Sequence, residues 1–513
     1  MPCRSQRVVW SKLGSRQGAS MFDRSILQPS VKHKETIMTT SFYWHDYETW
    51  GTDPRRDRAV QFAGIRTDLD FNPIGSPLMV YAAPADDLLP QPAACMVTGI
   101  TPQLARQEGV CEADFFQAIH DELSRPGTCA LGYNSIRFDD EFTRYGLYRN
   151  FHDPYAREWQ NGNSRWDIID MVRLMRALRP EGINWPQNKD GITSFRLELL
   201  TEVNGIAHAG AHDALVDVRA TIALARLVKE KQPRLFDYVF NNRDKHKLAQ
   251  QLSLRDQQPV LHVSAKYPAR LGCIAVVVPV AQHPANRNGI IVYDLRVDPQ
   301  PLFDLSVEQI RNKLYTPSSE LEEGEQRIPL KMISINHAPV VVPLNTLTDV
   351  AREEWALDAV REEQHLQAIR QAPQLQKKIQ QVFAEQQFEE TSDPDQNLYA
   401  GFISRHDRRL CDQVLDSSPE DLAAFHPPFE DSRLPELLFR YRARNWPASL
   451  SVQEKERWEA YRRYRLTQPD GGSSIDLSEY RRQLSHMVID PQLTVDQRQV
   501  VDALLDWPEE IGL

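Results

Sequence analysis

Two carboxylates at the end of a short apolar stretch constrain this chain more than any other feature of its sequence. Asp46 and Glu48 lie in the stretch 41–50, which reads SFYWHDYETW. In an extended strand, side chains two residues apart point to the same face of the sheet. Two acids on one buried face repel each other and are costly to desolvate. The pattern therefore predicts either a divalent metal between the carboxylates or an edge strand whose acids are solvated.

The composition limits the class of protein. A length of 513 residues predicts two to four domains, because one hydrophobic core rarely serves so long a chain. The net charge of −11 argues against a general nucleic-acid coat, although a local basic groove remains compatible with it. The six cysteines are scattered without a CxxC pair, which predicts reduced thiols in a cytoplasmic protein. No run of about 18 apolar residues occurs, so we expect no membrane partner.

The first 37 residues differ from the rest, with seven Lys and Arg residues against two acids. They lack the apolar region of a secretory signal. The pattern predicts a disordered basic leader at 1–40, a basic arm that touches nucleic acid, or a true start at Met21 or Met38.

The hydrophobic pattern divides the remaining chain into three parts. From 41 to 232, apolar strand-like runs alternate with stretches of helical spacing, which predicts an α/β domain. From 233 to 387, short apolar runs punctuated by Pro and Asn predict a small barrel or sandwich, followed by helices. The part from 388 to 513 is mostly helical. In the first part we expect strands at 41–46, 59–67, 78–83 and 128–133, and helices at 112–125, 139 onward, 167–178, 195–203 and 213–231.

Three more polar residues complete a pattern with the first two acids. Asp139 follows an apolar run, and His212 and Asp217 stand five residues apart at the start of the last helix of the α/β domain. Taken singly, Asp139 suits the positive end of a helix dipole, Asp217 suits a solvated helix face, and His212 suits a helix cap. Taken together, they form D-x-E on a strand, a later Asp, and H-x₄-D on a late helix.

This combination resembles the DEDDh 3′→5′ exonucleases, and further stretches resemble the bacterial exodeoxyribonuclease I family in particular. Those stretches are HDYETWGT at 45–52, GYNSIRFDDE at 132–141, ALRPEGINWP at 177–186, SFRLE at 194–198 and QPRLFDY at 232–238. The resemblance covers nearly all of the chain from about residue 41. It implies a ribonuclease H-like α/β exonuclease domain with a mixed sheet at 41–232, an SH3-like β domain with trailing helices at 233–387, and a C-terminal helical domain at 388–513.

The resemblance also implies an activity. The chain would be a magnesium-dependent exodeoxyribonuclease that releases 5′-mononucleotides from the 3′ end of single-stranded DNA in repair and recombination. Two Mg²⁺ ions, which Mn²⁺ can replace, would stabilise the attacking and leaving oxygens of the phosphodiester. The implied metal ligands are Asp46, Glu48 and Asp217. Asp139 would complete the site partly through water, and His212 would be the general base, which its ordinary pKa of ~6.5 suits.

Two neighbouring acids, Asp140 and Asp213, stand out of register with the motif, and we expect no catalytic role for them.

The segment 143–180 predicts a surface that binds a single strand. It holds seven arginines against four acids, with six aromatic residues interleaved. Single-strand binders use cations for phosphates and aromatic rings for base stacking. We expect Tyr145, Phe151 and Trp166 in the core instead. By the resemblance, the strand-contacting residues are Glu48, Arg144, Tyr155, Trp159, Arg173, Arg179, Phe195 and Arg196.

Single-stranded DNA and the acidic C-terminal tail of single-strand DNA-binding protein are the partners that the resemblance implies, with the chain acting as a monomer. A second basic and aromatic run, FRYRARNW at 439–446, either lines the strand path or packs on a neighbouring domain. Two other functions remain open. An RNA-trimming exonuclease of the same superfamily is disfavoured by the extra domains, and a scaffold without catalysis is disfavoured by the filled catalytic positions.

Overall fold

The computed structural model describes residues 39–208, 210, 212–317, 320, 327–384 and 391–513. The predicted basic leader and its alternative starts lie outside these residues, apart from residues 39 and 40.

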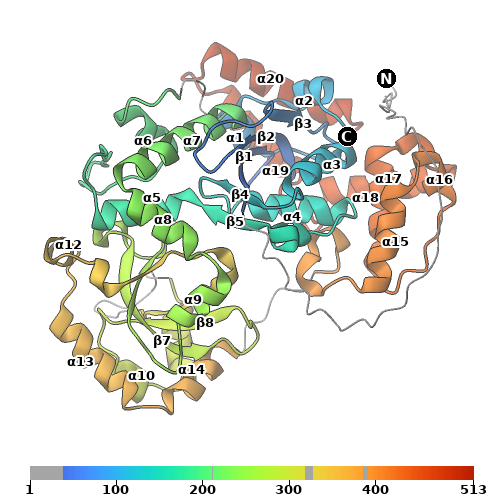
Figure 1. The fold of residues 1–513 in the computed structure, drawn as a ribbon. Coiled ribbons are helices and arrows are strands. Elements are labelled where there is room, and N and C mark those ends of the chain that lie inside the picture. The colour runs from blue at the N-terminus through green and yellow to red at the C-terminus, as the bar shows by residue number, and fades with distance from the viewer. Residues whose placement is uncertain (1–38, 209, 211, 318–319, 321–326, 385–390) are drawn as a thin grey trace, which may run out of the picture. The chain divides into compact units, whose positions relative to one another are not determined.

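The first domain is built on a five-stranded mixed sheet with the order β3-β2-β1-β4-β5 (Figure 1). The central strand β1 pairs antiparallel with β2 and parallel with β4. This arrangement confirms the predicted mixed sheet. The strands are β1 (Ser41–Thr49), β2 (Ala59–Thr67), β3 (Leu78–Tyr81), β4 (Thr128–Gly132) and β5 (Ser164–Asp167).

The helices of this domain agree with the predicted ones at most positions. One difference concerns β5, which was missed because four residues are too few to show a period; the helix expected from residue 167 begins after it, at Ile168. The long helix α7 packs against β1 and β2. The helices are α1 (Pro92–Thr98), α2 (Pro102–Glu108), α3 (Glu112–Leu123), α4 (Asp139–Arg149), α5 (Ile168–Leu178), α6 (Leu197–Val203), α7 (Ala214–Lys231) and α8 (Pro233–Asn241).

The second part contains an antiparallel five-stranded sheet with the order β10-β6-β7-β8-β9. The short apolar runs form these strands, and nearly every residue of β7 and β8 is buried. Its strands are β6 (Val260–Val263), β7 (Ile274–Gln282), β8 (Gly289–Asp294), β9 (Leu330–Ser334) and β10 (Val341–Pro343). Its helices are α9 (Lys245–Gln251), α10 (Gln300–Asp304), α11 (Val307–Tyr315), α12 (Asp349–Glu354), α13 (Ala359–Arg370) and α14 (Leu375–Ala384).

The third part is helical in its described residues. The basic and aromatic run at 439–446 lies mostly in α17, where its rings and most of its arginine side chains are buried. This burial supports the packing interpretation of that run. The helices are α15 (Arg405–Asp416), α16 (Pro419–Ala424), α17 (Leu434–Asn445), α18 (Val452–Thr467), α19 (Leu477–Val488) and α20 (Val495–Glu510).

Buried contacts join the three parts. The indole nitrogen of Trp355 donates to the carbonyl of Ala177 at 2.9 Å, and one hydrophobic cluster runs from the first sheet into the second. On the other side, the guanidinium of Arg444 binds Asp87 of the first part at 2.9 Å and Asp395 at 2.5 Å. Within the described residues, no helix combines the length and the apolar character needed to cross a membrane.

Candidate active site

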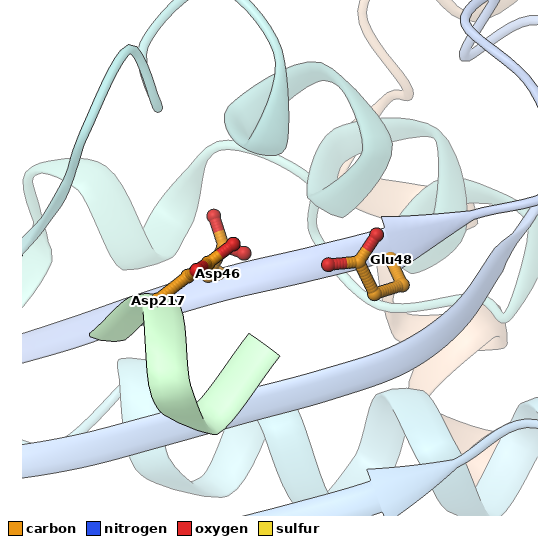
Figure 2. A group of neighbouring side chains, drawn as sticks. All are labelled: Asp46, Glu48 and Asp217. Atoms are coloured by element: carbon orange, nitrogen blue, oxygen red, sulfur yellow. The ribbon is translucent and has the colours of Figure 1, made fainter. Parts of the chain in front are cut away.

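Three carboxylates from two elements meet at one position beside β1. Asp46 and Glu48 lie on the same face of β1, and Asp217 lies in the first turn of α7 (Figure 2). Each offers a carboxylate oxygen, and these oxygens all lie within 4.8 Å of one another. The period of two in the strand aligns the first two acids, and the packing of α7 across the strand brings in the third.

The carboxylates at this position carry unbalanced negative charge. Burial and the nearby Asp217 raise the pKa of Asp46 well above its usual range. Burial, together with Asp46, Asp217 and Asp213, raises the pKa of Glu48 to about 9. Among the described residues, no lysine or arginine contributes to the pKa shift of Asp46 or of Glu48. A group of oxygen donors without a protein cation is the environment that a divalent metal ion stabilises.

Asp139 lies next to this group but outside it. It is the first residue of α4 and is buried. Its Oδ1 accepts a hydrogen bond from the backbone N–H of Tyr47, between the two acids of β1, at 3.2 Å. Burial and the charge of Asp46 raise the pKa of Asp139 well above its usual range. The fourth acid of the motif therefore shares the electrostatic environment of the first.

The two acids that we expected to be non-catalytic have structural contacts. Asp140 is buried and ion-paired with Arg157 and Arg165, each at 2.6 Å. Burial alone would raise the pKa of Asp140, but the neighbouring arginines hold it below its usual range. Asp213 is the N-cap of α7, and its Oδ1 accepts hydrogen bonds from Leu215 N–H and Val216 N–H. These contacts account for both residues without a catalytic role.

Two histidines, His208 and His212, precede Asp217 in the sequence. The one that contacts Asp217 in the structure is His208, which was not predicted. Nε2 of His208 lies 2.5 Å from Oδ1 of Asp217, and its Nδ1 lies 2.8 Å from the hydroxyl of Thr201. His212, the predicted general base, is exposed and has a positive φ of 71°. His208 was not among the predicted site residues, because its distance from Asp217 in the sequence does not fit the H-x₄-D spacing. The catalytic role of His212 stays a prediction.

A cleft of about 570 Å³ leads from the carboxylates to part of the predicted strand surface. Asp46 and Asp217 line it together with Arg173, Phe195 and Arg196. The guanidinium of Arg173 lies over the ring of Phe195, 5.7 Å from its centre, and also pairs with an acid of its own helix, Asp170. These three predicted strand residues therefore border the same cavity as two of the acids.

The remaining predicted strand residues lie elsewhere. Arg144 is buried, and its guanidinium bonds to Glu141, Glu158 and the hydroxyl of Tyr399. It is thus an ion-pair partner in this structure, and its contact with the strand stays a prediction. Tyr155 packs edge-on against Phe402, with 5.6 Å between the ring centres.

Two predicted strand residues remain, Trp159 and Arg179. Trp159 is 66% exposed, as a stacking residue requires. Arg179 donates to the neighbouring carbonyl of Leu178. The three rings assigned to the core, Tyr145, Phe151 and Trp166, are buried, which confirms that prediction.

Three family models match the chain in succession. A model described as Exonuclease matches residues 43–225. Exonuclease I SH3-like domain matches 243–385, and Exonuclease I C-terminal domain matches 392–511. The order and type of these domains confirm the predicted fold class.

Proteins of known identity are similar over nearly their full length. Exodeoxyribonuclease I of Escherichia coli (strain K12) is 46% identical over 475 residues, which are 92% of this chain and 98% of that protein. A crystal structure of E. coli exonuclease I in complex with a dA16 oligonucleotide is 45% identical, has a TM-score of 0.87, and covers 92% of this chain and all of that one. A crystal structure of SSB/exonuclease I with the inhibitor CFAM is 44% identical, with a TM-score of 0.85 and coverage of 92% and 100%.

Proposed function

The chain belongs to the exodeoxyribonuclease I family, and from this membership we propose that it removes 5′-mononucleotides from the 3′ end of single-stranded DNA. The observation that carries the proposal is the group formed by Asp46, Glu48 and Asp217 at the end of a cleft. A related protein was crystallised with a single-stranded oligonucleotide, which supports the same substrate class here. Cleavage from the 3′ end, release of mononucleotides and a role in DNA repair and recombination follow from family membership.

The donor set fits Mg²⁺. All three groups are carboxylates, and hard divalent cations prefer oxygen ligands. Among the described residues, no lysine or arginine lowers the pKa of Asp46 or Glu48. We propose that Asp46, Glu48 and Asp217 hold two such ions, with Mn²⁺ able to substitute. When bound, the ions would supply positive charge to the attacking and leaving oxygens of the phosphodiester.

The other residues of the motif would act on water and on the strand. Asp139, beside β1, would hold a water of the metal site through its second oxygen, since its first accepts from Tyr47. His212 would take the proton from the attacking water, because a neutral imidazole accepts a proton near neutral pH. Its exposed position leaves the ring free to approach the site. Glu48 would also contact the terminal nucleotide.

The direct test is digestion of a 5′-labelled single strand with Mg²⁺, with and without a 3′-phosphate. We expect products shortened from the 3′ end, inhibition by EDTA, and slower reaction of the blocked strand. Asp46→Asn should lower the rate by on the order of 10³-fold, because charge stabilisation by metals contributes several kcal/mol. The matched control is Asp213→Asn, which should stay active because Asn caps a helix as well as Asp does.

Near-normal cleavage by folded Asp46→Asn would contradict the proposal. The same assay with a matched RNA strand and a blunt DNA duplex tests the substrate class. A duplex should react poorly, because its bases are already stacked and paired. An RNA rate equal to or above the DNA rate would favour the RNA-trimming alternative.

We also propose a protein partner and a location. The acidic C-terminal tail of single-strand DNA-binding protein would bind this monomeric enzyme, and the structure of SSB with a related exonuclease I supports that partner. The buried thiols of Cys95, Cys129, Cys273 and Cys411 fit a reducing cytoplasm. Titration of the enzyme into a fluorescent peptide with the tail sequence tests the partner. A peptide of the same composition in scrambled order is the control.

A further inference from the structure

The cleft beside the carboxylates is also lined by a segment that holds none of the predicted site residues. This segment lies between β6 and β7 in the second part of the chain. Ala265, Tyr267, Ala269 and Cys273 line the cleft there. Three of these side chains are small, so Tyr267 is the one large surface that this segment offers to the cavity.

A buried histidine fixes the hydroxyl end of Tyr267. The hydroxyl lies 2.9 Å from Nδ1 of His262, a residue of β6. Burial, together with Lys331 and Arg137, lowers the pKa of His262 well below its usual range, so the imidazole is neutral at physiological pH. The two rings meet edge-on, with 5.5 Å between their centres. This hydrogen bond fixes the position of the hydroxyl, whichever of the two groups donates.

A lysine covers one face of the same ring. Nζ of Lys331, in β9, lies 4.3 Å from the ring centre of Tyr267. Nζ is buried and has no hydrogen-bond acceptor among the described residues. Burial lowers the pKa of Lys331 to about 7, and in its protonated form the amine is attracted to the aromatic face. Tyr267 is held at its hydroxyl and at one face, and the rest of its ring borders the cleft.

We infer that Tyr267 is a stacking surface for a nucleobase of the bound single strand, positioned by His262 and Lys331. A ring held at two points loses little conformational freedom on binding, which lowers the cost of association. Stacking requires no particular base, so it suits an enzyme that digests any sequence. The alanines beside the ring leave room for a base. This inference rests on the proposed function, and it adds a strand contact from outside the exonuclease domain.

The test measures affinity for single strands in EDTA, where a metal-dependent nuclease does not cut. Wild type, Tyr267→Ala and Tyr267→Phe are titrated with a 5′-labelled oligonucleotide and with versions that carry one abasic residue at successive positions from the 3′ end. Stacking contributes ~1–3 kcal/mol per base, so Tyr267→Ala should weaken binding of the intact strand by roughly 5- to 150-fold. Tyr267→Phe keeps the ring and should weaken it less.

The abasic series separates stacking from a merely structural role. One abasic position should weaken binding by wild type and have little further effect on Tyr267→Ala, because the missing base and the missing ring remove the same contact. If Tyr267→Ala weakens all strands equally at every position, the ring does not stack and the inference is wrong. Tyr464→Ala, a half-exposed tyrosine of α18, is the control and should bind as wild type does. If Tyr267→Ala fails to fold, Tyr267→Leu replaces it.

Digestion of the same oligonucleotides by wild type with Mg²⁺ is measured in parallel. Absence of 3′-end shortening there would overturn the proposed function itself, whereas normal shortening with no position-specific abasic effect would overturn only the role of Tyr267.

Discussion

Nε2 of His208 lies 2.5 Å from Oδ1 of Asp217. The imidazole thus contacts one of the three clustered carboxylates, while the histidine in the motif position, His212, is exposed. The opposite ring nitrogen of His208 contacts Thr201, so both nitrogens have partners. A histidine held in this way is suited to orienting a metal ligand, as buried partners of metal ligands often are.

The first prediction separates the two histidines. His212→Asn should lower kcat by about 10²- to 10⁴-fold, the usual contribution of a general base, with little change in metal dependence. His208→Asn should instead raise the Mg²⁺ concentration needed for half-maximal rate by about 10- to 100-fold. Rates measured across a Mg²⁺ titration with a labelled single strand check both. A His208→Asn enzyme whose kcat falls as far as that of His212→Asn at saturating metal would argue against this division of roles.

The second prediction concerns Asp140, whose carboxylate neutralises Arg157 and Arg165. Asp140→Asn should destabilise the fold by about 3–5 kcal/mol, because it leaves two buried arginines with Glu158 as their remaining acidic partner. The folded-state pKa of Asp140 is lowered. Its stabilisation is therefore present above the ordinary pKa of ~3.9 and is lost as pH falls through the lower folded value. Acid unfolding followed by circular dichroism should show wild type losing stability below about pH 4, with a flatter profile for the variant.

The third prediction concerns Glu48. Burial and three neighbouring acids raise its pKa to about 9. A carboxyl with a raised folded pKa binds more protons when folded. Its stabilisation is therefore complete below the ordinary pKa of ~4.3 and is lost as pH rises toward 9. Metal-free wild type should lose thermal stability between pH 6 and 9, by several degrees on the scale of ~2–4 °C per kcal/mol.

Glu48→Gln is the control, because an amide does not titrate and should flatten this part of the profile. Mg²⁺ should stabilise wild type more at pH 8 than at pH 6, since the metal competes with protons for the carboxylates. Melting temperatures in EDTA and in Mg²⁺ decide the point, and parallel profiles for wild type and variant would contradict it.

The fourth prediction compares two residues that the sequence assigned alike to the strand. Trp159→Ala should weaken single-strand binding by ~1–3 kcal/mol and leave the melting temperature unchanged, because the indole is exposed. Arg144→Ala should instead destabilise the protein by about 3–5 kcal/mol, because Glu141 and Glu158 lose their buried partner. Binding titrations and thermal melts of the two variants distinguish a surface contact from an internal ion pair.

The spacing of residues close together in the sequence determined much of the secondary structure and the face on which each site residue lies. The alternation of β1 placed Asp46 and Glu48 on one face, and helical spacing predicted the helix at 213–231 with Asp217 near its start. These features depend on residues close together in the chain, whose geometry follows from the periods of strand and helix. The motif as a whole was specific enough to indicate the family.

Only the tertiary structure decided which chemical groups meet. It brought Asp217 to Asp46 across 171 positions of the sequence. It also buried Arg144 among acids and set Tyr267, from the segment between β6 and β7, beside the cleft. Such contacts join elements far apart in the chain, and their partners depend on how helices and sheets pack, which local spacing does not encode. For the same reason, the motif indicated His212 but not the contact between His208 and Asp217, which appears only in the folded protein.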